Sequence, residues 1–100
     1  MQIKSMDPIT LKKRLEEGSA VLIDVREPHE HAMANIECAR LIPLQTLPEY
    51  VNTLPRDRQI YIHCKAGMRS ARAVQMLMSH GFTEVSNVEG GMDSWLAEEN

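Results

Sequence analysis

Cysteine pairs and long apolar segments are both scarce in this sequence. Its two cysteines, Cys38 and Cys64, form no Cys-x-x-Cys pair, so neither a disulfide framework nor a zinc site is indicated. The longest wholly apolar run lies within residues 20–23, far too short to cross a bilayer, and residues 1–5 lack the apolar stretch of a signal peptide. We therefore expect a cytoplasmic protein that does not bind membranes.

A basic excess is also missing. The 100 residues include 14 acidic and 11 basic side chains, which gives a formal net charge of -3. This balance argues against nucleic-acid binding, which usually needs a basic face. Hydrophobic residues make up 43% of the chain, enough for one core at this length but not for two. We expect a single domain over residues 1–100 that acts as a monomer.

Acidic residues are absent from the segment between Asp57 and Glu84. The basic residues within that segment are Arg58, Lys65, Arg69 and Arg72. The segment is therefore locally positive on a chain that is acidic as a whole. Such a local field favours a small anion as ligand over a polyanion.

Strand and helix signals alternate along the chain. Strands are predicted at 20–25, 40–43, 59–63 and 84–88, from their apolar runs and their β-branched and aromatic residues. Helices are predicted at 8–17, 28–34, 47–54, 70–80 and 92–96, from helical spacing and capping residues. This alternation implies an α/β fold with an open parallel sheet and helices on both faces. Ligands of such sheets bind at the carboxyl ends of the strands.

Cys64 stands between a predicted strand and a predicted helix. Unpaired backbone N–H groups and the positive end of the helix dipole favour a thiolate there. Lys65 and Arg69 add positive charge, and Gly67 lets the backbone curl so that successive N–H groups point inward. We predict a reactive thiolate at Cys64, the alternative being a buried and inert cysteine. The predicted anion-binding residues are Lys65, Ala66, Gly67, Met68, Arg69 and Ser70.

The segment Cys64-Lys65-Ala66-Gly67-Met68-Arg69-Ser70 resembles the active-site loop of single-domain rhodaneses, the thiosulfate sulfurtransferase family. Further likenesses lie in residues 22–27, in Ile36 with Ala39 and residues 42–44, and in residues 89–91 with Trp95. The resemblance implies five parallel strands flanked by helices and a persulfide formed on Cys64. It also implies a sulfurtransferase that needs no cofactor or metal.

The reaction implied by the resemblance moves sulfane sulfur from thiosulfate, or a similar small anionic donor, to a thiol or cyanide. A sulfur-carrier protein is a further acceptor of the same chemistry. Some positions depart from the family pattern: Ala34-Asn35 replaces a common Gly-His pair, Cys38 a common glycine, and His31 a common aromatic residue. None of these changes removes the nucleophile.

Two alternative functions remain open at this point. A cysteine phosphatase or arsenate reductase would place its loop arginine at position 70, where this chain has Ser70 and a loop one residue shorter. The acid-free segment also offers no general acid for a leaving alkoxide. A persulfide relay module that docks on a partner in a sulfur-carrier pathway is the other alternative, and the sequence barely separates it from an enzyme.

Several polar residues outside the loop have simpler interpretations. Asp24 and Arg26 follow a predicted strand and are expected to pair with each other or with Glu30. Cys38 is interpreted as a small apolar loop residue. His63 is expected to point away from the Cys64 side of its strand. The other histidines, His29, His31 and His80, are expected at the surface.

Overall fold

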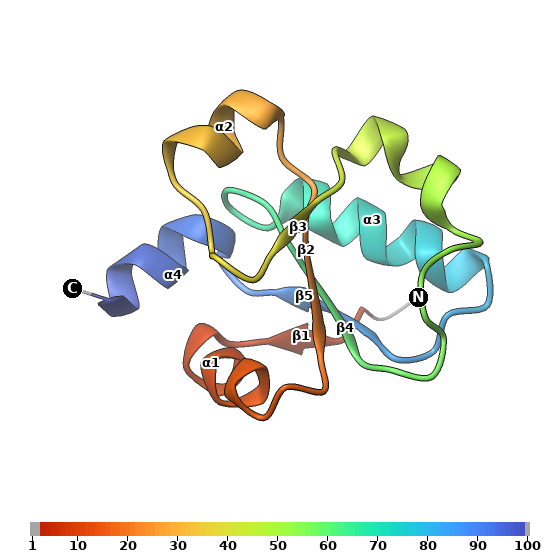
Figure 1. The fold of residues 1–100 in the computed structure, drawn as a ribbon, viewed down its shortest axis with the longest axis horizontal. Helices are drawn as coiled ribbons and strands as arrows, with labels where there is room; N and C mark the ends of the chain where they lie inside the picture. The colour runs from red at the N-terminus through yellow and green to blue at the C-terminus, as the bar shows by residue number, and fades with distance from the viewer. Residues whose placement is uncertain (1–2, 100) are drawn as a thin grey trace.

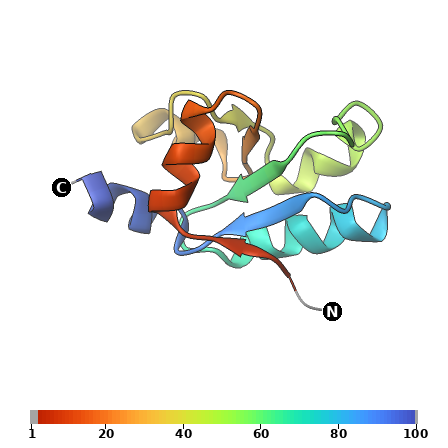
Figure 2. The ribbon, with the colours of Figure 1, turned by 90° about the horizontal axis from the view of Figure 1, so that it is seen from below.

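The computed structural model describes residues 3–99, in which five strands form one sheet in the order β1-β5-β4-β2-β3. The strands are Ser5–Met6 (β1), Val21–Asp24 (β2), Arg40–Leu41 (β3), Ile60–His63 (β4) and Val85–Val88 (β5). All neighbouring strands are parallel, and Figure 2 shows β1, β4 and β5 side by side. The predicted parallel α/β sheet is confirmed.

Helices cover both faces of this sheet. They are α1 (Pro8–Glu16), α2 (Pro28–Met33), the 3-10 helix η1 (Leu44–Tyr50), α3 (Met68–Ser79) and α4 (Gly91–Glu99). In Figure 1, α1 and α4 lie on one side of the sheet, and α3 and η1 lie on the other. The prediction of helices on both faces is therefore confirmed.

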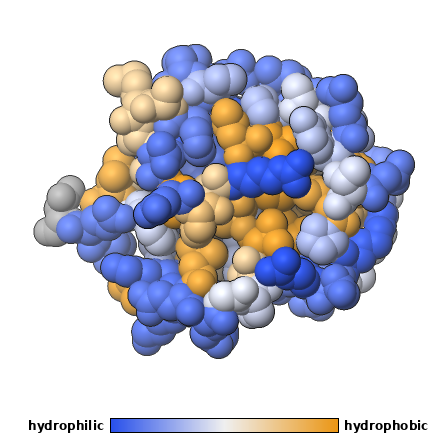
Figure 3. Space-filling view, in the orientation of Figure 1, coloured by the Kyte–Doolittle hydropathy of each residue, from blue (hydrophilic) through white to orange (hydrophobic). Residues whose placement is uncertain are grey.

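The sheet separates two apolar cores, because successive strand residues point to opposite faces. On β4, Ile60 and Ile62 belong to the core that also contains residues of α3 and η1. Tyr61, between them, belongs to the core that contains residues of α1 and α4. Every residue of β4 is buried. On the face seen in Figure 3, apolar side chains gather near the centre and hydrophilic side chains surround them.

The first helix follows its sequence signals closely. The Asp7 carboxylate accepts a hydrogen bond from the Thr10 N–H at 2.8 Å, and Pro8 occupies the first helical turn. Gly18, just past the helix, has a φ of 80°, which glycine adopts at little cost. The predicted start and stop of this helix are confirmed.

The strand β1 is absent from the sequence-based predictions, which place four strands. Ser5 and Met6 pair with Asn87 and Val88 of β5. A two-residue strand is too short to show alternation, so its pattern carries no signal. The fifth strand was implied only by the family resemblance.

Two helix predictions need correction. Residues 47–54 do not form one helix: η1 is a 3-10 helix that ends at Tyr50 and contains Pro48, whose nitrogen has no proton for an α-helical hydrogen bond. Leu47, Val51 and Leu54 are nevertheless buried. The helix predicted at 92–96 is longer, since α4 runs Gly91–Glu99, and its Leu96 is 40% exposed.

The length and polarity of the helices bear on whether any of them could span a membrane. No helix within residues 3–99 combines the length and the apolar character that a membrane span requires.

Candidate active site

The Cys64 loop joins the carboxyl end of β4 to the start of α3, at the edge of the sheet where a crevice was predicted. The amino end of α4 holds it in place. The Met92 N–H donates to the Cys64 carbonyl at 2.8 Å, and the Asp93 N–H donates to the Lys65 carbonyl at 3.0 Å. Gly91 packs against these carbonyls so closely that a Cβ atom there would collide with both oxygens.

The Cys64 sulfur is buried, with 1% of the residue exposed. The Gly67 N–H donates to Sγ at 3.0 Å, and the Ser70 Oγ lies 3.3 Å from it. Burial raises the pKa of the Cys64 thiol, but hydrogen bonds from Ser70 and from the Gly67 and Ala66 N–H groups outweigh burial and leave the pKa lowered. The environment thus stabilises the thiolate relative to that of an ordinary cysteine.

Gly67 makes this arrangement possible through its backbone. Its φ is 112°, a region that L-residues with a Cβ rarely adopt. In this conformation its N–H points at Sγ while the chain turns into α3. The predicted curling role of Gly67 agrees with this geometry. Helix α3 begins at Met68, two residues before its predicted start, so Arg69 and Ser70 lie in its first turn.

The sequence predicts that Arg69 adds an unpaired positive charge to the loop. In the structure this charge is paired with a carboxylate. Its Nη1 and Nη2 donate to the two carboxylate oxygens of Glu30 at 2.7 and 2.9 Å. The Arg69 hydrogen bonds hold the pKa of Glu30 at about 2. Glu30 belongs to α2, outside the acid-free segment, so the count of charges along the chain could not anticipate this pair.

Lys65 is likewise paired. Its Nζ lies 3.1 and 3.2 Å from the carboxylate oxygens of Asp93 on α4. The Lys65 side chain is 64% exposed, so the pair is solvated and weak. Met68 is 75% exposed, and Ala66 is also exposed. The segment without acids in the sequence therefore faces two carboxylates in space.

Asn87 is the site residue that the sequence analysis missed. It lies on β5 opposite Ile62 of β4. Its Oδ1 accepts from the Ser70 Oγ at 2.5 Å, and its Nδ2 donates to the Gly67 carbonyl at 3.3 Å. An amide side chain between two valines of a strand, three residues before Gly90-Gly91, was the available signal. Asn87 links β5 to both partners of the Cys64 sulfur.

A buried charged cluster lies at the end of β2. Arg26 Nε and Nη2 donate to the Asp24 carboxylate at 2.9 and 2.8 Å, which confirms the expected pairing. His31 Nδ1 lies 2.9 Å from Asp24 Oδ2, so the prediction of a surface role for His31 is wrong. Burial raises the pKa of Asp24, but hydrogen bonds from Arg26 and His31 outweigh it and bring the pKa to about 2.

His63 completes this cluster without entering the Cys64 site. Its Nε2 lies 3.9 Å from Asp24 Oδ2, and its Nδ1 lies 3.3 Å from the Cys64 carbonyl oxygen. Burial lowers the pKa of His63, which favours the neutral ring. Nε2 has no hydrogen-bond partner among the described residues. The ring therefore contacts the backbone of Cys64, while the sulfur has other partners.

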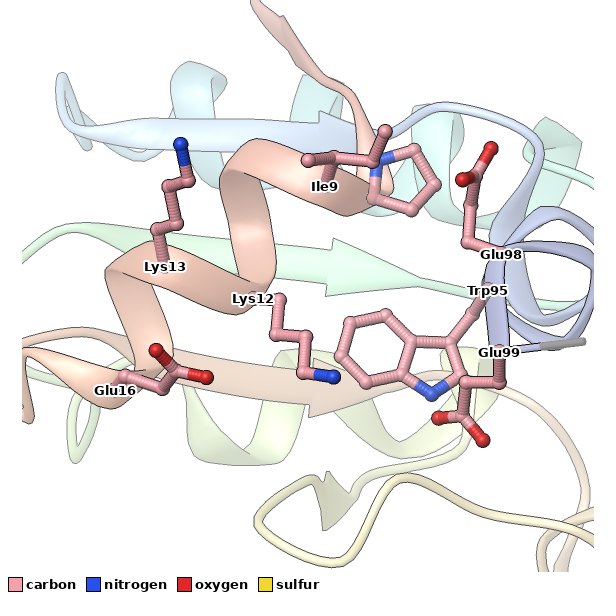
Figure 4. A pocket seen from close by; sticks show the side chains of 8 residues that line it. Ile9, Lys12, Lys13, Glu16, Trp95, Glu98 and Glu99 are labelled. Carbon is pink, nitrogen blue, oxygen red and sulfur yellow. The ribbon is translucent and has the colours of Figure 1, made fainter.

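Outside the loop, the described residues include a second cysteine and a hollow. Cys38 and Cys64 are both free thiols, the first exposed and the second buried. Within residues 3–99, no group of three or more His, Cys, Asp or Glu side chains could hold a metal ion. A hollow of about 350 Å³ between α1 and α4 is lined by residues such as Ile9, Lys12 and Trp95, none of them from the Cys64 loop (Figure 4).

Known proteins resemble this chain in both fold and sequence. The rhodanese-like domain family matches residues 7–98. A sulfurtransferase of Allochromatium vinosum is 34% identical over 94 residues, 93% of this chain and 88% of that protein. The crystal structure of a rhodanese-like domain protein from Staphylococcus aureus is 39% identical with a TM-score of 0.86, covering 93% of this chain and 91% of that one.

One relative is considerably longer than the region it shares with this chain. The uncharacterized protein YqhL of Bacillus subtilis is 43% identical over 76 residues, which are 76% of this chain and 60% of that protein. The chain thus spans less than two thirds of the length of this relative.

Proposed function

The chain belongs to the rhodanese-like domain family, and we propose that it transfers sulfane sulfur as a persulfide on Cys64. Similarity to a named sulfurtransferase supports this class of activity. The single observation that carries the proposal is the buried Cys64 sulfur, which accepts the Gly67 N–H at 3.0 Å and has a lowered pKa. A sulfur that is already stabilised as an anion can attack without a separate general base.

In the first step, the Cys64 thiolate attacks the outer sulfur of thiosulfate or a similar donor. A new S–S bond forms to Sγ, the S–S bond of thiosulfate breaks, and its electron pair leaves with sulfite. One negative charge then sits on the terminal sulfur of the persulfide. Backbone N–H groups at the start of α3 stabilise that charge, as they stabilise the thiolate before it.

In the second step, the persulfide gives up its outer sulfur. A thiolate acceptor becomes a persulfide and cyanide becomes thiocyanate, while the bonding pair returns to Cys64 as thiolate. Two easier displacements replace one difficult transfer. Neither step needs an external oxidant or reductant.

The loop contents distinguish this function from phosphoester hydrolysis. Among the carboxylates near the loop, Glu30 accepts two hydrogen bonds from Arg69. Glu30 has a pKa of about 2, so near neutral pH it carries no proton for a leaving alkoxide. The lack of a transferable proton on Glu30 favours transfer of a sulfur atom over phosphoester cleavage.

Intact mass spectrometry tests the proposal. After incubation with thiosulfate, the wild-type chain should gain the mass of one sulfur atom, and Cys64→Ser should gain none. Cys38→Ser is the matched control and should load as the wild type does. Cyanide should remove the added mass and release thiocyanate. Loading of Cys64→Ser, or turnover of a phosphoester without sulfur loading, would refute the proposal.

The same experiment separates an enzyme from a relay module. A relay would load slowly from free thiosulfate and rapidly from the persulfide of a partner protein. Comparison of the two loading rates, at equal donor concentration, decides between these roles.

A further inference from the structure

The Ser70 hydroxyl lies among more acceptors than it can serve. Its Oγ is 2.5 Å from Asn87 Oδ1, 3.2 Å from the Gly67 carbonyl oxygen and 3.3 Å from Cys64 Sγ. A hydroxyl carries one proton, although it can accept two hydrogen bonds. The shortest of these contacts, to Asn87, identifies where that proton points in this structure.

The orientation of the Asn87 amide follows from its second contact. Its Nδ2 donates to the Gly67 carbonyl at 3.3 Å, and a carbonyl oxygen can only accept. Oδ1 must therefore face Ser70 and accept its proton. Exchanging the two amide atoms would bring two donors together at Ser70 unless the hydroxyl turned away, and would bring two oxygens together at Gly67.

Protonation of the sulfur then changes what Ser70 must do. A Cys64 thiol can donate its S–H to Ser70 Oγ while Ser70 donates to Asn87, so each group is satisfied. A Cys64 thiolate has no proton to give; the Gly67 N–H already donates to it, and a further donor would stabilise it more. Ser70 can provide one only by turning its proton from Asn87 Oδ1 to Sγ.

We propose that Asn87 is a positioning residue that competes with the Cys64 thiolate for the single Ser70 proton, and so controls how readily the nucleophile ionises. The proposal rests on the proposed function only in naming Cys64 as the nucleophile. Burial sharpens the competition, because Ser70 and Cys64 are 0% and 1% exposed and water cannot easily replace a lost partner.

The charged and titratable groups around Cys64 stay the same in every variant used below. They are Lys65 with Asp93 of α4, Arg69 with Glu30 of α2, and His63 with Asp24 at the ends of β4 and β2. None of them contacts the Ser70 hydroxyl through a hydrogen bond among the described residues. A change in ionisation on altering Asn87 is therefore assigned to the hydroxyl.

The test titrates Cys64 without any sulfur donor, in a Cys38→Ser background. The rate of alkylation by iodoacetamide as a function of pH reports the pKa of Cys64. Asn87→Leu, which has nearly the same shape without polar atoms, should lower this pKa by about one unit, the size of a hydrogen bond to a charged group. Ser70→Ala should raise it. Asn87→Leu combined with Ser70→Ala should match Ser70→Ala alone.

Two further variants keep the result decisive. Asn87→Ala should shift the pKa in the same direction if Asn87→Leu fails to fold. Ser86→Ala, at the neighbouring position of β5, is the matched control and should leave the pKa unchanged, because Ser86 bonds Gln59 instead. An unchanged or raised pKa in both Asn87 variants, or an effect that persists without the Ser70 hydroxyl, would overturn the proposal.

This outcome is independent of sulfur loading. If Cys64 fails to form a persulfide while the pKa shifts as expected, the proposed function fails and the competition stands. If loading succeeds and the shifts do not occur, the competition fails and the function stands.

Discussion

The two carboxylate oxygens of Glu30 lie 2.7 and 2.9 Å from two guanidinium nitrogens of Arg69, in a bidentate pair that joins α2 to the first turn of α3. The two residues are 39 positions apart in the chain. Such pairs combine charge with fixed geometry. The loop arginine is therefore anchored by the helix that follows β2, the strand next to β4 in the sheet.

We expect Glu30→Gln to improve the use of thiosulfate. The glutamine keeps a hydrogen bond to Arg69 but removes the charge that competes with an anionic donor. The KM for thiosulfate should fall by about two- to fivefold, the value of a partly exposed ion pair. Thiocyanate formation at varied thiosulfate and fixed cyanide measures it, with the exposed Glu37→Gln as control. A raised KM would mean that Glu30 chiefly holds the loop in shape.

The same pair predicts a loss of stability in acid. The pKa of Glu30 is lowered from 4.5 to about 2 on folding. The contribution of the ionised Glu30 to the free energy of unfolding is therefore complete above pH 4.5 and is lost as pH falls toward 2. The urea midpoint of the wild type should drop across this window, and that of Glu30→Gln should drop less. Asp24, also at about 2, adds to the fall in both proteins. An equal fall of the urea midpoint with pH in the wild type and in Glu30→Gln would contradict the prediction.

Arg69→Ala should impair the protein more than Arg72→Ala does. Removing Arg69 leaves the Glu30 carboxylate, with a side chain 21% exposed, without its partner, whereas Arg72 is exposed. We expect Arg69→Ala to lower both kcat/KM for thiosulfate and the urea midpoint. Arg72→Ala should change kcat/KM by no more than about twofold, which is the effect of one distant solvated charge. Equal effects would indicate general electrostatic steering.

Gly91→Ala should displace the Cys64 loop. The new Cβ would collide with the Cys64 and Lys65 carbonyl oxygens, and the φ of 55° is already unfavourable for alanine. Gly18→Ala is the matched control, because its φ of 80° is also positive but its Cβ would meet no atom within 4 Å. Gly18→Ala should cost about 1 to 2 kcal/mol in unfolding free energy. Gly91→Ala should cost more and also abolish sulfur loading. If both variants lost the same unfolding free energy and Gly91→Ala still loaded sulfur, the predicted collision would be wrong.

The main elements of the fold could be predicted from local patterns. Asp7, Pro8 and Gly18 bracket α1 because capping and turn preferences act within a few residues. The apolar runs at 20–25 and 59–63 predicted β2 and β4, because both strands are buried by helices on either side. β1 was not predicted because a strand of two residues shows no alternation of apolar and polar side chains. The segment that contains η1 was predicted as a regular helix, although Pro48 lies within it.

The sequence by itself determined the backbone setting of Cys64, the proposed nucleophile: it follows a buried strand, and Gly67 turns the chain so that an N–H reaches Sγ at 3.0 Å. Those are effects of neighbouring residues on one stretch of backbone. Only the tertiary structure decided which side chains surround it. Glu30, Asp93 and Asn87 reach the loop from α2, α4 and β5 because the strand order places those elements around the end of β4. Charge pairing over such separations depends on packing, which no local pattern encodes.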